Sequence, residues 1–590
     1  MKKKKIWNKK NLPLDIAKAE NFGMLILALS SGICGILQIY AVSGFVNVAL
    51  ESIHKSLLNR HLLGTLFLLL LTVAMDWLAP RFSGILRQKA ELKLVRQYRP
   101  RMLKKCASLQ YIHVEQADSL DLIERVLKEP EKNWQDIYQA ILALLKLFIN
   151  IIGILIVIAG YVWWAAGIIL LFCIPLFTFS VKGGKKNYQT QRDTSCYSRK
   201  YWYLDYVLNS RECLNERKIF GYTEKVNKQY ADTYQEAFGI ETKMQAFWAV
   251  KTKLSGGLSA IAALLIVITL IQPTLSGKIS IGLFISLVNV VFSLTSQMSW
   301  GLSRNIDALV KGNEFCRDMR DFWNLEEEEG ILDAPKYMNE IKKIEFKNVS
   351  FRYPGTDYLV LEQVSFRLNW GQNYAFVGAN GAGKTTIIKL LTGLYKGYQG
   401  EIRINGKELR SYSPAEQKGI FSVVYQDFYR HALSFRENCE ISDPCHNLSE
   451  EEMKKLTRQF DLQQTIENFP EGYDTLLGKI RKGGMDLSGG EWQKMAMLRA
   501  LLRPAKVRIL DEPTASLDPK MESEIYQLFQ QMTKDSLTIL ISHRLGFAKL
   551  ADQILVFEKG RICEQGDFEK LMEKKGIFYK MYEEQRSWYQ

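Results

Sequence analysis

A phosphate-binding pattern lies in the second half of this 590-residue chain. Residues 378–385 read Gly-Ala-Asn-Gly-Ala-Gly-Lys-Thr, which fits the spacing G-x-x-x-x-G-K-[ST]. Glycines at these positions let backbone N–H groups close around phosphate oxygens, while Lys384 neutralises the β and γ phosphates and Thr385 offers its hydroxyl to magnesium. A strand-like segment at residues 374–377 precedes the loop and a helix-like one follows from Thr386, which is the context that the motif requires.

Two adjacent carboxylates follow about 130 residues later, at the end of the apolar segment 507–510. Asp511 suits the coordination shell of magnesium, and Glu512 is placed to polarise an attacking water as a general base. Such a pair on its own is more often a solvated strand end. Together with the phosphate loop, it predicts hydrolysis of a nucleoside triphosphate.

Residues 487–491, Leu-Ser-Gly-Gly-Glu, resemble the signature motif of the ATPases of ABC transporters. Further motifs of that family occur in the family's order, with Tyr353 ahead of the phosphate loop, Gln426 after it, and Asp518 and His543 after the carboxylates. The resemblance covers the whole chain, because six apolar stretches ahead of one ATPase domain resemble the half-transporter layout of ABC exporters. It implies an ATPase coupled to transport across a membrane.

The resemblance implies a role for each motif residue. Catalysis would rest on Glu512, on His543 at the γ-phosphate and on Gln426 near the attacking water. Magnesium would be held by Thr385, Gln426 and Asp511. The residues that would contact ATP are Tyr353, under the adenine ring, and Gly378, Asn380, Gly381, Gly383, Lys384, Thr385, Thr386, Ser488, Gly489, Gly490 and Asp518. The implied cofactors are therefore ATP and Mg²⁺.

A second half-transporter is the implied partner. In the family the signature motif serves ATP held by the phosphate loop of the other subunit, and one chain has one copy of each motif. Because Glu512 and His543 are both intact, a homodimer is favoured, while a heterodimer in which this chain supplies the complete residues stays open.

Six apolar stretches ahead of residue 324 are long enough to cross a membrane as helices. They lie near residues 22–50, 61–79, 137–159, 161–181, 243–272 and 279–300. The two long loops between them mix charged and periodic apolar residues, which predicts helical extensions. The expected fold class is an α-helical transmembrane bundle of six helices with long cytoplasmic extensions, joined to an α/β P-loop ATPase domain with a helical subdomain.

The expected domain boundaries follow from the change in composition. Residues 1–323 form the transmembrane domain, and residues 324–340, which contain the acidic run Glu326–Glu329, read as a solvated linker. Residues 341–590 form the nucleotide-binding domain, whose helical subdomain is expected at about 430–500.

The positive charge of the chain lies in its membrane half. The whole chain has a net charge of +15, but residues 341–590 contribute only +3 of it. An anionic membrane surface therefore explains the charge better than a nucleic acid, which is not expected as a partner. The basic loops place the N-terminus, the C-terminus and the ATPase domain in the cytoplasm of a multi-pass protein, for which a bacterial plasma membrane is preferred.

Two segments of the sequence bear on the cargo. Residues 210–221 and the Glu491-Trp492-Gln493-Lys494 segment resemble bacterial lantibiotic and other peptide exporters, which favours export of an amphipathic peptide. Multidrug export and lipid flipping are the alternatives, and an ABC-type ATPase without transport is the alternative of another class. Asp76 and Lys146, two charged residues within apolar stretches, either line the path of the cargo or pair with each other.

Overall fold

The computed structural model describes residues 13–55, 60–443, 448–478, 484–513, 536–542 and 544–587. The chain divides into two units. The first unit comprises the residues up to Cys106 together with Asp121–Leu325, and the second comprises Ala107–Leu120 together with the residues from Glu326 onward. A short piece of the membrane half therefore belongs to the second unit.

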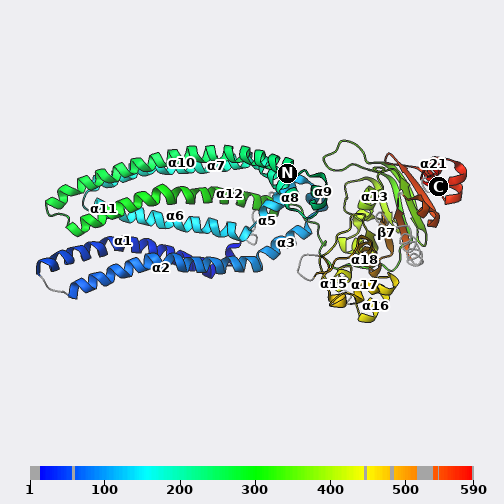
Figure 1. Cartoon of the computed structure of the whole chain (residues 1–590), viewed down its shortest axis with the longest axis horizontal. Coiled ribbons are helices and arrows are strands. Elements are labelled where there is room, and N and C mark those ends of the chain that lie inside the picture. Colours follow the sequence, from blue (N-terminus) through cyan, green and yellow to red (C-terminus); the bar gives the residue numbers. More distant parts are fainter. Residues whose placement is uncertain are drawn as a thin grey trace. The chain divides into compact units, whose positions relative to one another are not determined.

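The first unit is a bundle of long helices (Figure 1). After a 3₁₀ turn at Pro13–Asp15, its helices are α1 (Lys18–Lys55), α2 (Arg60–Gln97), α3 (Arg99–Ser108), α5 (Ala117–Leu127), α6 (Pro130–Ala159), α7 (Trp163–Asp193), α8 (Ser195–Asn209), α9 (Leu214–Phe220), α10 (Thr223–Leu275), α11 (Ile281–Ser296) and α12 (Ser303–Asn324), with a π-helical turn at Gln297–Leu302. At 53 residues, α10 is about 80 Å long, which is more than twice the thickness of the hydrocarbon core. Figure 1 shows α7 and α10 running side by side along the bundle.

Four of the six predicted spans lie within single helices: 22–50 in α1, 61–79 in α2, 137–159 in α6 and 243–272 in α10. Span 161–181 begins two residues before α7, and span 279–300 extends beyond both ends of α11 and into the π-helical turn. In the described part of the chain, three helical segments are long and apolar enough to cross a membrane: Lys18–Ile53, Arg60–Ser108 and Pro130–Ala159. Two shorter apolar helices, Ala263–Leu275 and Ile281–Ser293, lie where the last two spans were predicted. The chain is membrane-spanning, and the count of six spans stays a prediction.

The two charged residues of the apolar stretches pair with each other. The Lys146 Nζ lies 2.9 Å from Asp76 Oδ1, which also accepts a hydrogen bond from the Ser31 hydroxyl at 3.2 Å. The pair joins α2 to α6. Of the two roles expected for these residues, lining the path of the cargo or pairing with each other, the structure shows the pairing. Pairing lowers the free energy of placing both charges among apolar helices.

The second unit contains two sheets. One is antiparallel, with strand order β2-β1-β4-β5. The other has the order β10-β9-β3-β8-β7-β6 and is parallel except for the β9–β10 pair. The strands are β1 (Lys343–Phe351), β2 (Leu361–Asn369), β3 (Asn373–Gly378), β4 (Gln399–Ile404), β5 (Lys407–Glu408), β6 (Phe421–Val424), β7 (Val507–Asp511), β8 (Leu537–Ile541), β9 (Gln553–Glu558) and β10 (Arg561–Gly566).

The second unit also contains short helices, and those from α15 to α18 form a helical subdomain. The short helices are α4 (Tyr111–Glu115), α13 (Lys384–Leu391), α14 (Pro414–Ile420), α15 (Phe435–Glu440), α16 (Glu450–Gln459), α17 (Gln463–Glu467), α18 (Gly489–Leu502), α20 (Phe568–Lys574) and α21 (Ile577–Arg586). Helices α15 to α18 share an apolar core that includes Phe435, Met453, Phe460 and Trp492. A separate core lies between the two sheets and includes Phe346, Phe376 and Ile509.

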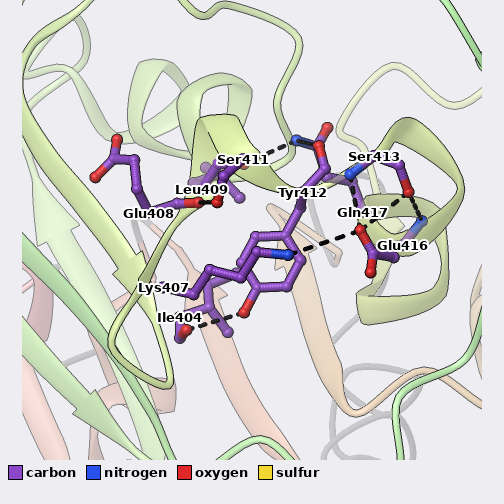
Figure 2. Close-up of polar contacts among 9 residues, drawn as sticks. All are labelled: Ile404, Lys407, Glu408, Leu409, Ser411, Tyr412, Ser413, Glu416 and Gln417. Carbon is purple, nitrogen blue, oxygen red and sulfur yellow. Dashed lines mark hydrogen bonds and ion pairs between the residues drawn. The ribbon is translucent and has the colours of Figure 1, made fainter.

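Helix α14 shows how local sequence positions one of the motif strands. Ser413 and Glu416 form a reciprocal capping box at its start, in which each side chain accepts a hydrogen bond from the backbone N–H of the other (Figure 2). The Tyr412 hydroxyl donates to the Ile404 carbonyl at 3.0 Å, so the end of β4 is tied to the same turn. Helix α14 then leads directly into β6, at whose end Gln426 lies.

Candidate nucleotide-binding site

The phosphate loop has the backbone that its glycines predict. Gly378, Gly381 and Gly383 have φ values of +154°, +78° and +99°, a region that L side chains rarely adopt. A Cβ on Gly383 would lie 2.6 Å from Leu361 Cδ2, and one on Gly378 would lie 2.2 Å from the Phe557 carbonyl oxygen. The loop therefore has room only for glycine at these two positions, and it curls tightly from β3 into α13.

Lys384 is folded back into its own loop. Its side chain is buried, and Nζ donates to the carbonyls of Gly378 at 2.7 Å and Ala379 at 2.9 Å. Burial lowers the pKa of Lys384 below the ordinary value for lysine, although the carboxylates of Glu512 and Asp511 act in the opposite direction. The ammonium group thus lies where the loop would enclose a phosphate, and its present partners are uncharged.

The two carboxylates lie at the same edge of the parallel sheet as the phosphate loop. Asp511 ends β7, which is separated from β3 only by β8. Asp511 is 2% exposed, and its Oδ1 is a buried acceptor without a hydrogen-bond partner among the described residues. Burial raises the pKa of Asp511 to about 6, against a hydrogen bond from Thr385 that lowers it. A divalent cation would fit here, because the carboxyl has one oxygen without a partner and lies next to the Thr385 hydroxyl, a second oxygen ligand.

Glu512 has a left-handed backbone, with φ at +50°. Its N–H continues the ladder by donating to the Ile541 carbonyl at 2.9 Å, so the residue is held at the end of the sheet. A left-handed residue other than glycine costs about 1–3 kcal/mol and persists where the surroundings impose it. This conformation turns the chain sharply after Asp511.

The signature segment begins α18 in the helical subdomain. Ser488 caps this helix and forms a capping box with Glu491, whose Oε1 also accepts a 2.5 Å hydrogen bond from Thr465. The first-turn N–H groups of Gly489 and Gly490 have no partner within the helix, which makes this end a favourable place for an anion. Among the described residues, no hydrogen bond or ion pair joins Ser488 to residues 378–386.

Helix α18 is nevertheless tied to the carboxylate strand. The Gln493 side chain, which is buried, donates to the carbonyl of Pro513, the residue after Glu512. One helix therefore carries the signature glycines at its start and contacts the carboxylate segment one turn later.

Tyr353 lies beyond the end of β1, next to the phosphate-loop helix. Its hydroxyl is 3.0 Å from the hydroxyl of Thr386, and its ring packs edge-on against Phe351 and Tyr395. The remaining predicted residues divide into two groups. Gln426 is exposed at the end of β6 and Asn380 is exposed in the loop, whereas His543 and Asp518 lie outside the described residues.

The sequence did not specify which contacts residues 107–120 make within the second unit. This segment pairs with the predicted linker, since Leu109 and Glu327 form an antiparallel bridge, and Glu328 forms a 2.5 Å ion pair with Lys396. Glu115 forms a 3.0 Å ion pair with Lys389 of α13. The sequence carries little signal for the contacts of segment 107–120, because Ser108 and its partner Glu327 are 219 positions apart and Glu115 and Lys389 are 274 positions apart.

Comparisons with known proteins agree with the motif analysis. The family described as ABC transporter matches residues 361–515. The subtilin transport ATP-binding protein SpaT of Bacillus subtilis is 29% identical over 95% of this chain and 90% of its own length. The nisin transport ATP-binding protein NisT of Lactococcus lactis is 27% identical over 93% of this chain and 92% of its own. The ATP-dependent lipid A-core flippase of Sodalis glossinidius is 26% identical over 83% of each chain.

The fold also has a counterpart among solved structures. A bacterial Atm1-family ABC exporter with ATP bound superposes with a TM-score of 0.75, at 20% identity, over 97% of this chain and 98% of that one. This likeness and the family match confirm the predicted fold class, a bundle with apolar helices joined to a β-containing ATPase domain.

Proposed function

We propose that this chain, which is an exporter-type ABC transporter with an ATPase domain, works as one half of a homodimer that exports an amphipathic peptide. The export of cargo driven by ATP rests on the family match and on full-length relatives. The main structural support for ATP hydrolysis is that the phosphate loop, Asp511 and Glu512 lie at the same edge of the parallel sheet.

Within this proposal each residue has a chemical task. The loop N–H groups and Lys384 bind the phosphates, and the Tyr353 ring supports adenine. Thr385, Gln426 and Asp511 would hold Mg²⁺, which when bound neutralises phosphate charge. Glu512 orients and deprotonates the attacking water, with His543 at the γ-phosphate, and Asp518 couples the two sites. Gly378, Asn380, Gly381, Gly383 and Thr386 shape the loop.

The position of Ser488 supports the proposed dimer. Its helix start is the anion-binding end of α18, yet it makes no polar contact with the phosphate loop of its own chain among the described residues. A second copy would bring Ser488, Gly489 and Gly490 to the γ-phosphate. ATP held by both copies favours the closed arrangement, and loss of the γ-phosphate releases it.

A peptide is favoured as cargo because two relatives that match over more than 90% of this chain are named for subtilin and nisin transport. The segment 210–221 points the same way. The location that fits is the plasma membrane of a bacterium, with both termini on the cytoplasmic side.

Lipid flipping is the second candidate. A relative named as a lipid A-core flippase matches 83% of this chain, and the helices of the bundle expose many large apolar side chains, among them Phe67 and Trp77. A non-transport ATPase is disfavoured, because the described part of the chain contains three helices of membrane-spanning length, which such an enzyme does not require.

Reconstitution in liposomes tests the proposal. The full chain is supplied with Mg-ATP and, in separate samples, with cationic amphipathic peptides, hydrophobic dyes or labelled lipids, and both ATP hydrolysis and accumulation are measured. Stimulation and transport by peptides alone support the proposal. Transport of labelled lipid without transport of peptide contradicts the peptide assignment, and hydrolysis with no transport of any cargo contradicts the exporter. The Glu512→Gln variant is the control for transport that does not depend on hydrolysis.

A further inference from the structure

One ion pair joins the short segment 107–120 to the phosphate-loop helix. Lys389 lies on α13, one turn after Thr385, and its Nζ is 3.0 Å from Glu115 Oε1. The Lys389 side chain is 22% exposed and that of Glu115 is 39% exposed. An ion pair this close to the surface contributes little to stability by itself. Its importance must come from what else Lys389 touches.

Lys389 also lies over three tyrosine rings. Its Nζ is 5.3 Å from the ring centre of Tyr353, 5.7 Å from that of Tyr111 and 6.0 Å from that of Tyr395. These distances are within the range in which an ammonium group is attracted to an aromatic face. Burial lowers the pKa of Lys389, but the Glu115 carboxylate and the tyrosines outweigh it and raise the pKa overall, so the side chain is charged at neutral pH.

The rings themselves form one packed group. Tyr111 contacts Tyr395 edge-on with ring centres 5.4 Å apart, and Tyr395 contacts Tyr353 edge-on at 5.5 Å. All three rings pack against the core between the two sheets. A cavity of ≈ 680 Å³ is lined by Tyr111 as well as by Tyr353, so a displacement of segment 107–120 changes the space beside the Tyr353 ring.

We propose that Lys389 is a positioning residue through which segment 107–120, by way of Glu115, sets the affinity of the site for the adenine base. This inference rests on the proposed function of Tyr353 as the adenine platform. Lys389 holds the Tyr353 ring in place while Glu115 holds Lys389. The segment continues α3 at one end and leads into α5 at the other, so a movement of these helices pulls on Glu115 and loosens the ring.

The coupling works in both directions. If docking of segment 107–120 strengthens the binding of ATP, then bound ATP must strengthen the docking of the segment by the same factor. Cargo that shifts the helices toward the docked arrangement would lower the ATP concentration needed for turnover.

Steady-state ATP hydrolysis by the full chain in liposomes tests this role. Glu115→Gln and Lys389→Met should each raise the KM for ATP by about threefold to tenfold, with kcat unchanged within about twofold. The double variant should be no worse than the poorer single variant, because both changes remove one interaction. Lys389→Arg keeps the charge over the rings and should retain a KM near that of the unmodified chain.

A matched control and a reference variant separate the possible failures. Lys396→Met is the matched control. Lys396 also pairs with a glutamate, Glu328, and lines the same cavity, but its ammonium group lies over none of the three tyrosine rings. This variant should leave the KM for ATP unchanged. Tyr353→Ala should raise KM at least as much as Lys389→Met. If Tyr353→Ala raises KM while the Glu115 and Lys389 variants do not, the present inference is wrong and the ATP site stands. If Tyr353→Ala has no effect, the adenine platform is wrong as well. Additive effects in the double variant, or a fall in kcat at constant KM, also contradict the inference.

Discussion

Replacing Asp511 by asparagine should stabilise the nucleotide-free protein while removing its activity. The pKa of this carboxyl rises from an ordinary value of 3.8 to about 6, chiefly because the side chain is buried. A difference of that size corresponds to about 3 kcal/mol at neutral pH, by which the ionised carboxylate destabilises the folded state. Asparagine removes the charge, although its new amide N–H group gives back about 1 kcal/mol if it finds no acceptor. The expected gain in stability is therefore about 1–3 kcal/mol.

The gain should depend on pH in a defined direction. Because the pKa is higher in the folded state, folding takes up a proton between about pH 4 and pH 6. The destabilisation by the carboxylate grows through that range and is complete above it. The advantage of Asp511→Asn should fall by about 1 kcal/mol between pH 7.5 and pH 5.5 and be lost toward pH 4. A lower pH should also weaken the binding of Mg²⁺, since a proton and the cation compete for the same carboxylate.

Thermal melting of the full chain in mild detergent, without nucleotide, provides the measurement. Asp511→Asn should melt at a higher temperature than the unmodified chain at pH 7.5, and ATP hydrolysis should be lost. Asp232→Asn, a change at an exposed position of α10, should alter neither. A melting temperature of Asp511→Asn at or below that of the unmodified chain refutes the reasoning, because burial of the charge would then not destabilise the fold.

Three further changes test other parts of the site and its support. Glu512→Gln should lower turnover by at least about 100-fold while ATP still drives dimer formation, as measured by size-exclusion chromatography; turnover near that of the unmodified chain would remove Glu512 from its role. Gly383→Ala should abolish binding of a fluorescent ATP analogue, because the new Cβ lies 2.6 Å from Leu361 Cδ2, whereas Gly406→Ala, at φ +84° with open space around it, should bind normally. Ser413→Ala should destabilise the fold by about 1 kcal/mol in urea titrations without changing the KM for ATP, and an unchanged midpoint would contradict the capping box.

The phosphate loop could be predicted in full from the sequence because its determinants are local. Its glycines, Lys384 and the flanking strand and helix all lie within residues 373–391, and the backbone has positive φ at Gly378, Gly381 and Gly383. The same holds for the start of α18, where Ser488 and Glu491 are three residues apart and form a capping box. Local spacing also predicted that Asp511 ends a strand.

Long-range pairing could not be predicted in the same way. Glu115 and Lys389 are 274 positions apart, and nothing in either neighbourhood specifies the other. The linker was expected to be solvated, yet the side chain of Glu328 is only 17% exposed, because it pairs with Lys396. The sequence also contains no sign that Glu512 has a left-handed backbone, since glutamate rarely adopts one and only the packing at the sheet edge imposes it.

Several residues of the site are held in an arrangement that is unfavourable for them. Asp511 bears a raised pKa, the pKa of Lys384 is lowered, and Glu512 has a left-handed backbone. Burial is the largest cause of both pKa shifts, and in each case it penalises the charged form of the group. A bound phosphate would give Lys384 an anionic partner, and a divalent cation would give Asp511 a cationic one. In the proposed site, part of the affinity for Mg-ATP would come from giving these two poorly solvated groups partners of opposite charge. A variant that removes one of the two charges should therefore melt at a higher temperature and bind Mg-ATP more weakly.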